Sequence, residues 1–326
     1  MFIKPLDDCV RYTGRWFKTQ EEAVTTAPGS YFEIGFKGSC CVLNFDVYMN
    51  FQPYGHIYIQ LDNGARTEVA VDRYIRVQCP DNGEHILKVI YKSAMELQPR
   101  WYEPLIGKVT FMGAEADGTV ALQEDRTPVI EFIGDSITEG IWVDEDRKIY
   151  GFPQENMVFQ NDSTATYAYL TAEALKMRPW IIGYGAVGIT KCGHGGVPSA
   201  IELYPYCYNG KKALIPNAEM IVINYGANDI YVSKEEYIDG YKAYLDFMRK
   251  INPHSKIIVL SPFSGYCAEE LGKMVNEYNK KNKDSVYYIN TKGWISPEPL
   301  HPSREGHKTV SENLIPILTK IRTDEI

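Results

Sequence analysis

The chain has 326 residues, of which 44% are hydrophobic and 23% charged, as in ordinary globular proteins, and it has enough apolar residues for two cores. The formal net charge is −8, and Lys and Arg do not cluster beyond local pairs such as Lys280-Lys281. These properties argue against nucleic acid and anionic membranes as partners and favour an uncharged substrate. They leave the oligomeric state open.

The amino-terminal residues and the cysteines bear on the cell compartment. Residues 1–8 contain no basic region followed by an apolar stretch, so no signal peptide is expected. No apolar run approaches the ~18 residues that a membrane span needs. The seven cysteines are odd in number and show no metal-ligand spacing. Reduced thiols in a cytoplasmic protein without a bound metal are therefore expected.

Residues 1–115 consist of short alternating runs separated by turn residues, without a helical period. In one such run Ile57, Ile59 and Leu61 share a face, and Asp62-Asn-Gly64 then marks a turn. Similar runs lie at 31–36, 40–49, 74–79, 85–91 and 109–112. Several short strands with regular turns predict a β-sandwich.

The pattern changes after a polar stretch near residues 113–128. Strands buried on both faces of a parallel sheet are predicted by short apolar runs at 129–133, 180–182, 220–224 and 256–260. Helical segments lie between them, and one carries Tyr237, Tyr241 and Tyr244 at a spacing typical of helix packing. The sequence therefore predicts an all-β sandwich over residues 1–123, followed by a three-layer α/β domain with a parallel sheet over residues 124–326.

The strongest chemical signal is the segment Phe132-Ile-Gly-Asp-Ser-Ile-Thr-Glu-Gly140. A buried strand is expected to end there, and a helix is expected to begin at Gly134-Asp-Ser136. Ester hydrolysis needs a nucleophilic oxygen at a rigid point and backbone N–H groups that stabilise the oxyanion. A serine at a strand-to-helix turn supplies both, because the first N–H groups of a helix lack partners. For Asp135-Ser136 alone, a plain helix cap would be the simpler interpretation.

Gly-Asp-Ser-Ile-Thr resembles the first block of the SGNH (GDS-type) hydrolase superfamily. Three later segments resemble the remaining blocks in the expected order, so that the resemblance spans roughly residues 129–320. It implies a flavodoxin-like parallel sheet and a serine esterase without metal or organic cofactor. By the resemblance, Ser136 is the nucleophile, and His301, in Leu300-His-Pro-Ser303, is its general base.

The same resemblance implies an oxyanion hole. Its donors would be the backbone N–H groups of Ser136 and Gly188 and the side-chain amide of Asn228. Gly188 lies in Gly185-Ala-Val-Gly-Ile-Thr190 and Asn228 in Gly226-Ala-Asn-Asp229, each directly after an expected strand. A neutral amide suits this task because it donates without titrating. Taken alone, either segment would be interpreted as a turn.

One position departs from the family. Most relatives have Asp three residues before the histidine, and this chain has Glu298 there, flanked by Pro297 and Pro299. Either Glu298 orients His301, or a backbone carbonyl holds the imidazole, as in relatives that use a Ser-His dyad. His307 falls in the expected final helix and is interpreted as structural.

The N-terminal half carries a second resemblance. Tyr12-Thr-Gly-Arg15, Gly29-Ser-Tyr-Phe-Glu-Ile34 and the domain order resemble carbohydrate esterase family two, whose members place a jelly roll before an SGNH domain and remove acetyl groups from sugars. This implies a deacetylase acting on a carbohydrate or glycoside. Trp142 follows the start of the nucleophile helix and Trp294 precedes His301 by seven residues, so that either could stack on a sugar or simply be buried. The simpler interpretation is a sandwich that only supports the catalytic domain.

Two other functions stay open. A general short-chain lipolytic esterase or thioesterase would differ from a sugar deacetylase in its acyl-chain preference. A carbohydrate-binding protein with a vestigial hydrolase site would be expected to have lost one of Ser136, Asn228 and His301, and all three are present. The stretch from Tyr150 to Phe159 is interpreted as an insertion that could shape a lid or a subunit contact.

Overall fold

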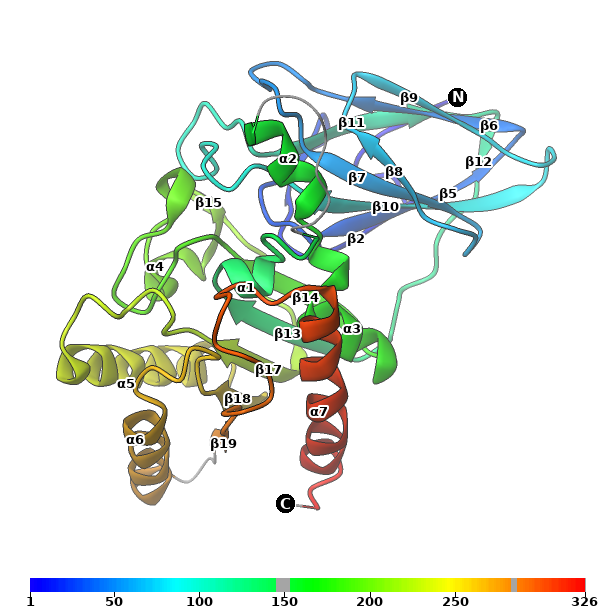
Figure 1. The fold of residues 1–326 in the computed structure, drawn as a ribbon. Helices are drawn as coiled ribbons and strands as arrows, with labels where there is room; N and C mark the ends of the chain where they lie inside the picture. Colours follow the sequence, from blue (N-terminus) through cyan, green and yellow to red (C-terminus); the bar gives the residue numbers. More distant parts are fainter. Residues whose placement is uncertain (145–152, 283–285, 326) are drawn as a thin grey trace.

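The computed structural model describes residues 1–144, 153–282 and 286–325 (Figure 1). The N-terminal part contains two antiparallel six-stranded sheets. The first comprises β1 (Phe2–Ile3), β3 (Phe17–Lys18), β4 (Ala23–Thr25), β6 (Cys40–Phe45), β9 (Tyr74–Gln78) and β11 (Val109–Glu115). The second comprises β2 (Val10–Thr13), β5 (Tyr31–Lys37), β7 (His56–Leu61), β8 (Thr67–Ala70), β10 (Glu84–Ser93) and β12 (Gly118–Thr119).

The two sheets pack face to face, because alternate side chains of their strands are apolar. In β6, Cys41, Leu43 and Phe45 are buried in the shared core. Phe32 of β5 stacks on Phe111 of β11 with ring centroids 4.3 Å apart, which joins one sheet to the other. The predicted β-sandwich is confirmed.

The C-terminal part is built on a five-stranded parallel sheet. Its strands are β13 (Val129–Gly134), β14 (Arg178–Gly183), β17 (Ala218–Asn224), β18 (Lys256–Leu260) and β19 (Val286–Ile289). They lie in the order β14-β13-β17-β18-β19, which is the flavodoxin-like order 2-1-3-4-5. In such sheets ligands bind beyond the carboxyl ends of the strands, where the strand order reverses.

Helices cover both faces of this sheet (Figure 1). Helices α4 (Ala200–Leu203), α5 (Lys234–Ile251) and α6 (Ala268–Lys281) pack on one face. Helices α1 (Ser136–Glu139), α3 (Tyr167–Ala174) and α7 (Arg304–Arg322) pack on the other, which confirms the three-layer α/β prediction. The predicted packing role of Tyr237, Tyr241 and Tyr244 is also confirmed, since all three side chains are buried. The remaining elements are α2 (Pro153–Gln160), η1 (Ser163–Ala165), η2 (His194–Gly196), β15 (Tyr206–Tyr208) and β16 (Lys211–Lys212).

The predicted insertion from 150 to 159 falls partly outside the described residues, which end at 144 and resume at 153 with α2. Its predicted role as a lid or subunit contact stays a prediction.

A buried polar contact joins the sandwich to the parallel sheet. Arg15 donates to the carbonyl oxygen of Tyr204 and lies 3.4 Å from the carboxylate of Glu131 in β13. The side chains of Arg15 and Glu131 are 1% and 0% exposed. Gly29 has φ +89°, and a Cβ there would lie 2.9 Å from Ile181 of β14. The segments 12–15 and 29–34, which resemble carbohydrate esterase family two, thus contribute to the contact between the sandwich and the α/β part. The boundary at residue 123 lies between β12 and β13 and stays a prediction.

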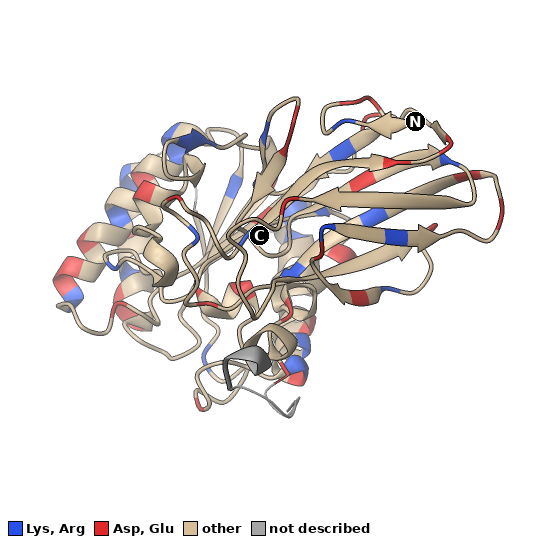
Figure 2. Cartoon of the chain, turned by 90° about the horizontal axis from the view of Figure 1, so that it is seen from above, with Lys and Arg blue, Asp and Glu red and all other residues tan. Residues whose placement is uncertain are grey.

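Acidic and basic residues are interspersed over the sandwich and over the outer helices (Figure 2). All seven cysteines are free thiols, and Cys192 is exposed. Within the described ranges no helix combines the length and apolarity that crossing a bilayer requires.

Candidate active site

The predicted nucleophile lies at the carboxyl end of β13, an inner strand of the parallel sheet between β14 and β17. The strand ends at Gly134, where any Cβ would collide with the side chain of Thr138. Asp135 caps α1, since its carboxylate accepts the backbone N–H of Ile137 at 3.0 Å. Ser136 is the first residue of the helix and 6% exposed, and its N–H has no partner within the helix. The strand-to-helix turn expected from the sequence is therefore present.

His301 meets Ser136 in space, although 165 positions separate them in the sequence. Its Nε2 lies 2.8 Å from the Ser136 Oγ, which is hydrogen-bonding distance. The histidine lies in the loop between β19 and α7 and is half-buried. In this position the imidazole can take the hydroxyl proton, as a general base for a serine nucleophile must.

The predicted oxyanion donors differ in their availability. Asn228 follows β17, is half-buried and donates through Nδ2 to the carbonyl oxygen of Val187 at 3.0 Å. An amide carries two N–H bonds, so one remains for a ligand among the groups that the structure describes. The N–H of Gly188, in contrast, donates to the carbonyl oxygen of Lys191 at 2.9 Å. Its predicted role therefore requires that bond to open, and it stays a prediction.

Asp229 explains why a glycine stands at position 188. A Cβ on Gly188 would lie 2.6 Å from the Asp229 carboxylate, which is 1% exposed. That carboxylate accepts the N–H of Ile189 at 3.1 Å, and both the N–H and the hydroxyl of Thr190 at 2.8 Å. Asp229 thus fixes the loop after β14 beside the loop after β17. The sequence did not predict this contact of Asp229 with the neighbouring loop.

Glu298 lies away from the role expected of it. Its side chain is exposed, and within the described part of the chain its carboxylate makes no hydrogen bond or ion pair. The contacts of Glu298 run through its backbone, which bonds to the hydroxyl of Ser296. The geometry therefore gives no support to a Ser136-His301-Glu298 triad. The role of Glu298 as the carboxylate that orients His301 remains only a prediction.

The two candidate stacking residues occupy different environments. Trp142 is 41% exposed, and its ring meets that of His301 with centroids 5.0 Å apart and planes at 77°. Trp294 is half-buried and packs against the core under α3 and α7. Trp142 is thus next to the reacting pair, whereas Trp294 has a packing partner that accounts for its burial.

The other histidines near the predicted site have structural partners. His307 is buried in α7, where its Nδ1 accepts the N–H of Tyr167 at 3.2 Å. Burial lowers the pKa of His307 to about 3, with a smaller electrostatic contribution from His301 and Arg304. His194 lies 3.0 Å from the Glu96 carboxylate. In residues 1–144, 153–282 and 286–325, no three His, Cys, Asp or Glu side chains come together as a metal site would require.

The sequence matches the GDSL-like Lipase/Acylhydrolase family over residues 132–309, which is more than half of the chain. The chain belongs to that family. It is accordingly a carboxylic ester hydrolase, and the matched segment contains Ser136, Asn228 and His301. A comparison with curated protein sequences finds no match.

Solved structures match the whole chain in fold. A family two carbohydrate esterase from Cellvibrio japonicus has a TM-score of 0.80 at 20% identity, over 99% of this chain and 98% of that one. A family two carbohydrate esterase from Clostridium thermocellum in complex with cellohexaose has a TM-score of 0.76 at 22% identity, over 97% and 100%. An acetyl xylan esterase from Butyrivibrio proteoclasticus has a TM-score of 0.76 at 17% identity, over 100% and 99%.

The GDSL-family site also contains a buried ion pair that sequence reasoning missed. Arg100, which follows the sandwich strand β10, donates to the carboxylate of Glu139 at the end of α1. That carboxylate also accepts the N–H of Gly185 at 2.7 Å, in the loop after β14. Glu139 stands three residues after Ser136 in the first block, but nothing in the sequence indicates that its partner lies 39 residues upstream.

Proposed function

We propose that the chain is a serine esterase that hydrolyses short acyl esters and removes acetyl groups from a carbohydrate or glycoside. The observation that carries the proposal is the 2.8 Å contact between the Ser136 Oγ and the His301 Nε2 at the carboxyl end of β13. A nucleophilic hydroxyl bonded to a base is the arrangement that acyl transfer needs.

The reaction proceeds in two steps. The Ser136 Oγ attacks the ester carbonyl carbon as its proton passes to His301 Nε2, and the carbonyl oxygen takes the negative charge. The N–H of Ser136 and the second N–H of Asn228 donate to this oxyanion, with Gly188 joining if its bond to Lys191 opens. When the intermediate collapses, the alcohol oxygen leaves with the proton held by His301. Water then attacks the acyl-serine by the same route, which releases the acid and restores Ser136.

The preference for a sugar ester rests on Trp142 and on the whole-chain likeness in fold. An exposed indole beside His301 offers a flat apolar surface to the alcohol part of an ester. Family two carbohydrate esterases match both parts of the chain, and the one from Clostridium thermocellum was solved in complex with cellohexaose. Trp294 is the weaker candidate for this contact because it packs against the core.

The rival functions make different predictions. A lipolytic esterase or thioesterase would accept long acyl chains at rising rates, whereas the proposed deacetylase prefers acetyl to butyryl and octanoyl esters. A binding protein with a vestigial site would bind sugars without turnover. The close Ser136–His301 contact argues against the latter.

The test combines one variant with one substrate panel. Ser136→Ala should lower hydrolysis of p-nitrophenyl acetate to less than about a hundredth of the wild-type rate. Ser233→Ala is the matched control, since that serine also begins a helix but only caps it, by accepting the N–H of Glu236. Acetylated sugars and p-nitrophenyl esters of two to eight carbons then define the substrate. Full activity of Ser136→Ala, or a rate that rises steadily to octanoyl, would overturn the proposal.

A further inference from the structure

Trp142 has a backbone conformation that a bulky residue rarely adopts. Its φ is +57°, in the left-handed region that favours glycine. Such a conformation is costly and persists only where the surroundings hold it, and it often marks a functional site. Trp142 is also exposed and lies against His301, so its strained backbone directs an aromatic ring toward the reacting pair.

The side chain that holds Trp142 is that of Asn161. The Asn161 Oδ1 accepts the N–H of Trp142 at 2.9 Å, and its Nδ2 donates to the carbonyl oxygen of Ala94 at 3.0 Å. Asn161 is 1% exposed, so both bonds are shielded from water. Ala94 directly follows β10, and Asn161 therefore bridges the loop of Trp142 to the sandwich.

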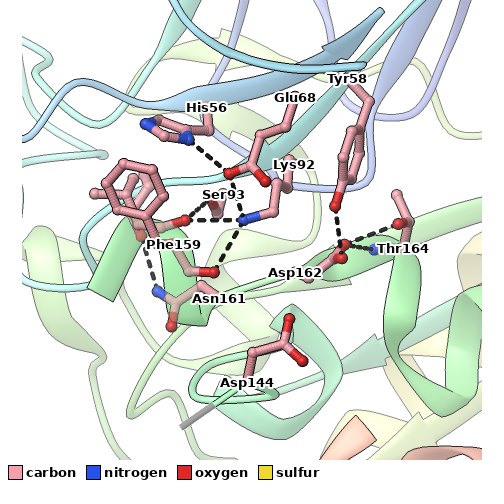
Figure 3. Close-up of polar contacts among 12 residues, drawn as sticks. His56, Tyr58, Glu68, Lys92, Ser93, Asp144, Phe159, Asn161, Asp162 and Thr164 are labelled. Atoms are coloured by element: carbon pink, nitrogen blue, oxygen red, sulfur yellow. Dashed lines mark hydrogen bonds and ion pairs between the residues drawn. The ribbon is translucent and has the colours of Figure 1, made fainter. Parts of the chain in front are cut away.

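The segment before Asn161 is itself anchored on the sandwich (Figure 3). Lys92, on β10 and 0% exposed, donates to the carbonyl oxygens of Val158 at 3.0 Å and Phe159 at 3.2 Å. The same ammonium lies 3.1 Å from the carboxylate of Glu68 on β8, which balances its charge. A buried lysine is stable only when it is paired in this way. Lys92 therefore ties the backbone at 158–159 to the second sheet of the sandwich.

Asp162, directly after Asn161, connects the same segment to the loop of His301. Asp162 is 1% exposed and accepts the hydroxyl of Tyr58 on β7 at 2.9 Å. It also lies 3.1 Å from Arg304, three residues after His301, and Arg304 in turn pairs with Asp144 at 2.6 Å. Tyr58, Asp162, Arg304 and Asp144 thus hold the loops of Trp142 and His301 beside the sandwich, and Figure 3 shows the contact between Tyr58 and Asp162.

We infer that Asn161 and Lys92 are positioning residues that set the specificity for the alcohol part of the ester, by holding Trp142 beside His301. The inference rests on the proposed sugar-ester hydrolase function and extends it. It gives the sandwich a role in substrate selection, through hydrogen bonds to the 158–162 segment. The substrate class is an ester whose alcohol has a ring with an apolar face that can stack on the indole.

The test compares an acetylated methyl glucoside with vinyl acetate, whose leaving group has no ring. Asn161→Ala and Lys92→Met should lower kcat/KM for the glucoside ~10-fold more than for vinyl acetate, through KM, because a displaced positioning contact can cost up to 100-fold. Trp142→Ala should show the same selective loss, and adding Asn161→Ala to it should cause no further loss, since both act through one contact. Asn279→Ala is the matched control, because Asn279 also bridges two backbone groups, the N–H and the carbonyl of Val286.

The outcomes separate the inference from the proposed function. If the wild type releases no acetate from acetylated sugars, the sugar-esterase function fails and the inference fails with it. If the wild type hydrolyses the glucoside, but Trp142→Ala or Asn161→Ala leaves the ratio of kcat/KM for the glucoside to kcat/KM for vinyl acetate unchanged, the inference alone is overturned. Vinyl acetate turnover and the thermal midpoint report folding. If Asn161→Ala fails to fold, the ratio of kcat/KM for the glucoside to kcat/KM for vinyl acetate in Lys92→Met and in Trp142→Ala decides whether the inference holds.

Discussion

Substitution of Arg100 by methionine is expected to destabilise the fold by about 3–5 kcal/mol, because it leaves the Glu139 carboxylate buried without its cation. The two side chains are 0% and 2% exposed. The guanidinium also donates to the carbonyl oxygen of Glu96 at 3.3 Å and lies 5.3 Å from the ring centroid of Tyr184. Since whole domains are stable by about 5–15 kcal/mol, the loss would be a large share of the total.

The loss should depend on pH. Burial raises the pKa of Glu139, and the charge of Arg100 opposes that rise. In Arg100→Met the pKa of Glu139 in the folded state rises further. At pH values between the pKa of Glu139 in the unfolded state and its pKa in the folded state, this carboxyl therefore takes up a proton when the chain folds. The variant is therefore closest to the wild type below the unfolded pKa of about 4.3 and loses stability as the pH rises through the folded pKa.

Guanidinium chloride unfolding at pH 5 and pH 8 measures this effect. Arg100→Met, Glu139→Gln and the double variant form a cycle, in which the double variant should lose less than the sum, because the amide is neutral and still accepts the N–H of Gly185. A loss below about 1 kcal/mol for Arg100→Met, or strict additivity, would refute the reasoning.

Three further predictions concern the site. Burial, with the nearby charge of Asp229, raises the pKa of Asp135 to about 7, so the wild type loses stability as the pH rises from 5 to 8. Asp135→Asn keeps the helix cap without this titration, and its free energy of unfolding relative to the wild type should increase by about 2–3 kcal/mol over that range. Denaturant unfolding measures the difference, and a difference that does not change with pH would contradict the prediction. Asn228→Ala should lower kcat by ~100-fold with little change in KM, whereas an unchanged kcat would reduce Asn228 to a turn residue. Glu298→Gln should lower kcat less than about tenfold, because its carboxylate is exposed and unbonded among the described residues, and a loss near ~10⁴-fold would restore it as the triad acid.

The sequence was most informative where local chemistry and periodicity act alone. The apolar run at 256–260 coincides with β18, and the run at 129–133 with all but the last residue of β13. The Gly134-Asp-Ser136 turn follows from a strand end and a helix cap, both of which are local signals. β19 was not predicted, although Val286–Ile289 is a run of β-branched and aromatic residues, which favours a strand.

Contacts between residues that lie far apart in the sequence could not be predicted from it. Nothing near Arg100 indicates that it meets Glu139, and nothing near Asn161 indicates that it holds Trp142. The spacing of Glu298 from His301 suggested a triad by resemblance, but the path of the loop decides where a side chain points, and here it places the carboxylate in solvent. Such contacts depend on tertiary packing, which a single sequence does not display.

The central claim is that Ser136 is the nucleophile. Incubation with a fluorophosphonate, followed by peptide mass spectrometry, tests it most directly, because only an activated serine reacts. The account predicts one adduct, on Ser136, formed at a rate that parallels the loss of esterase activity and absent from Ser136→Ala. An adduct on another residue, or full hydrolysis by a protein that carries no adduct, would contradict it.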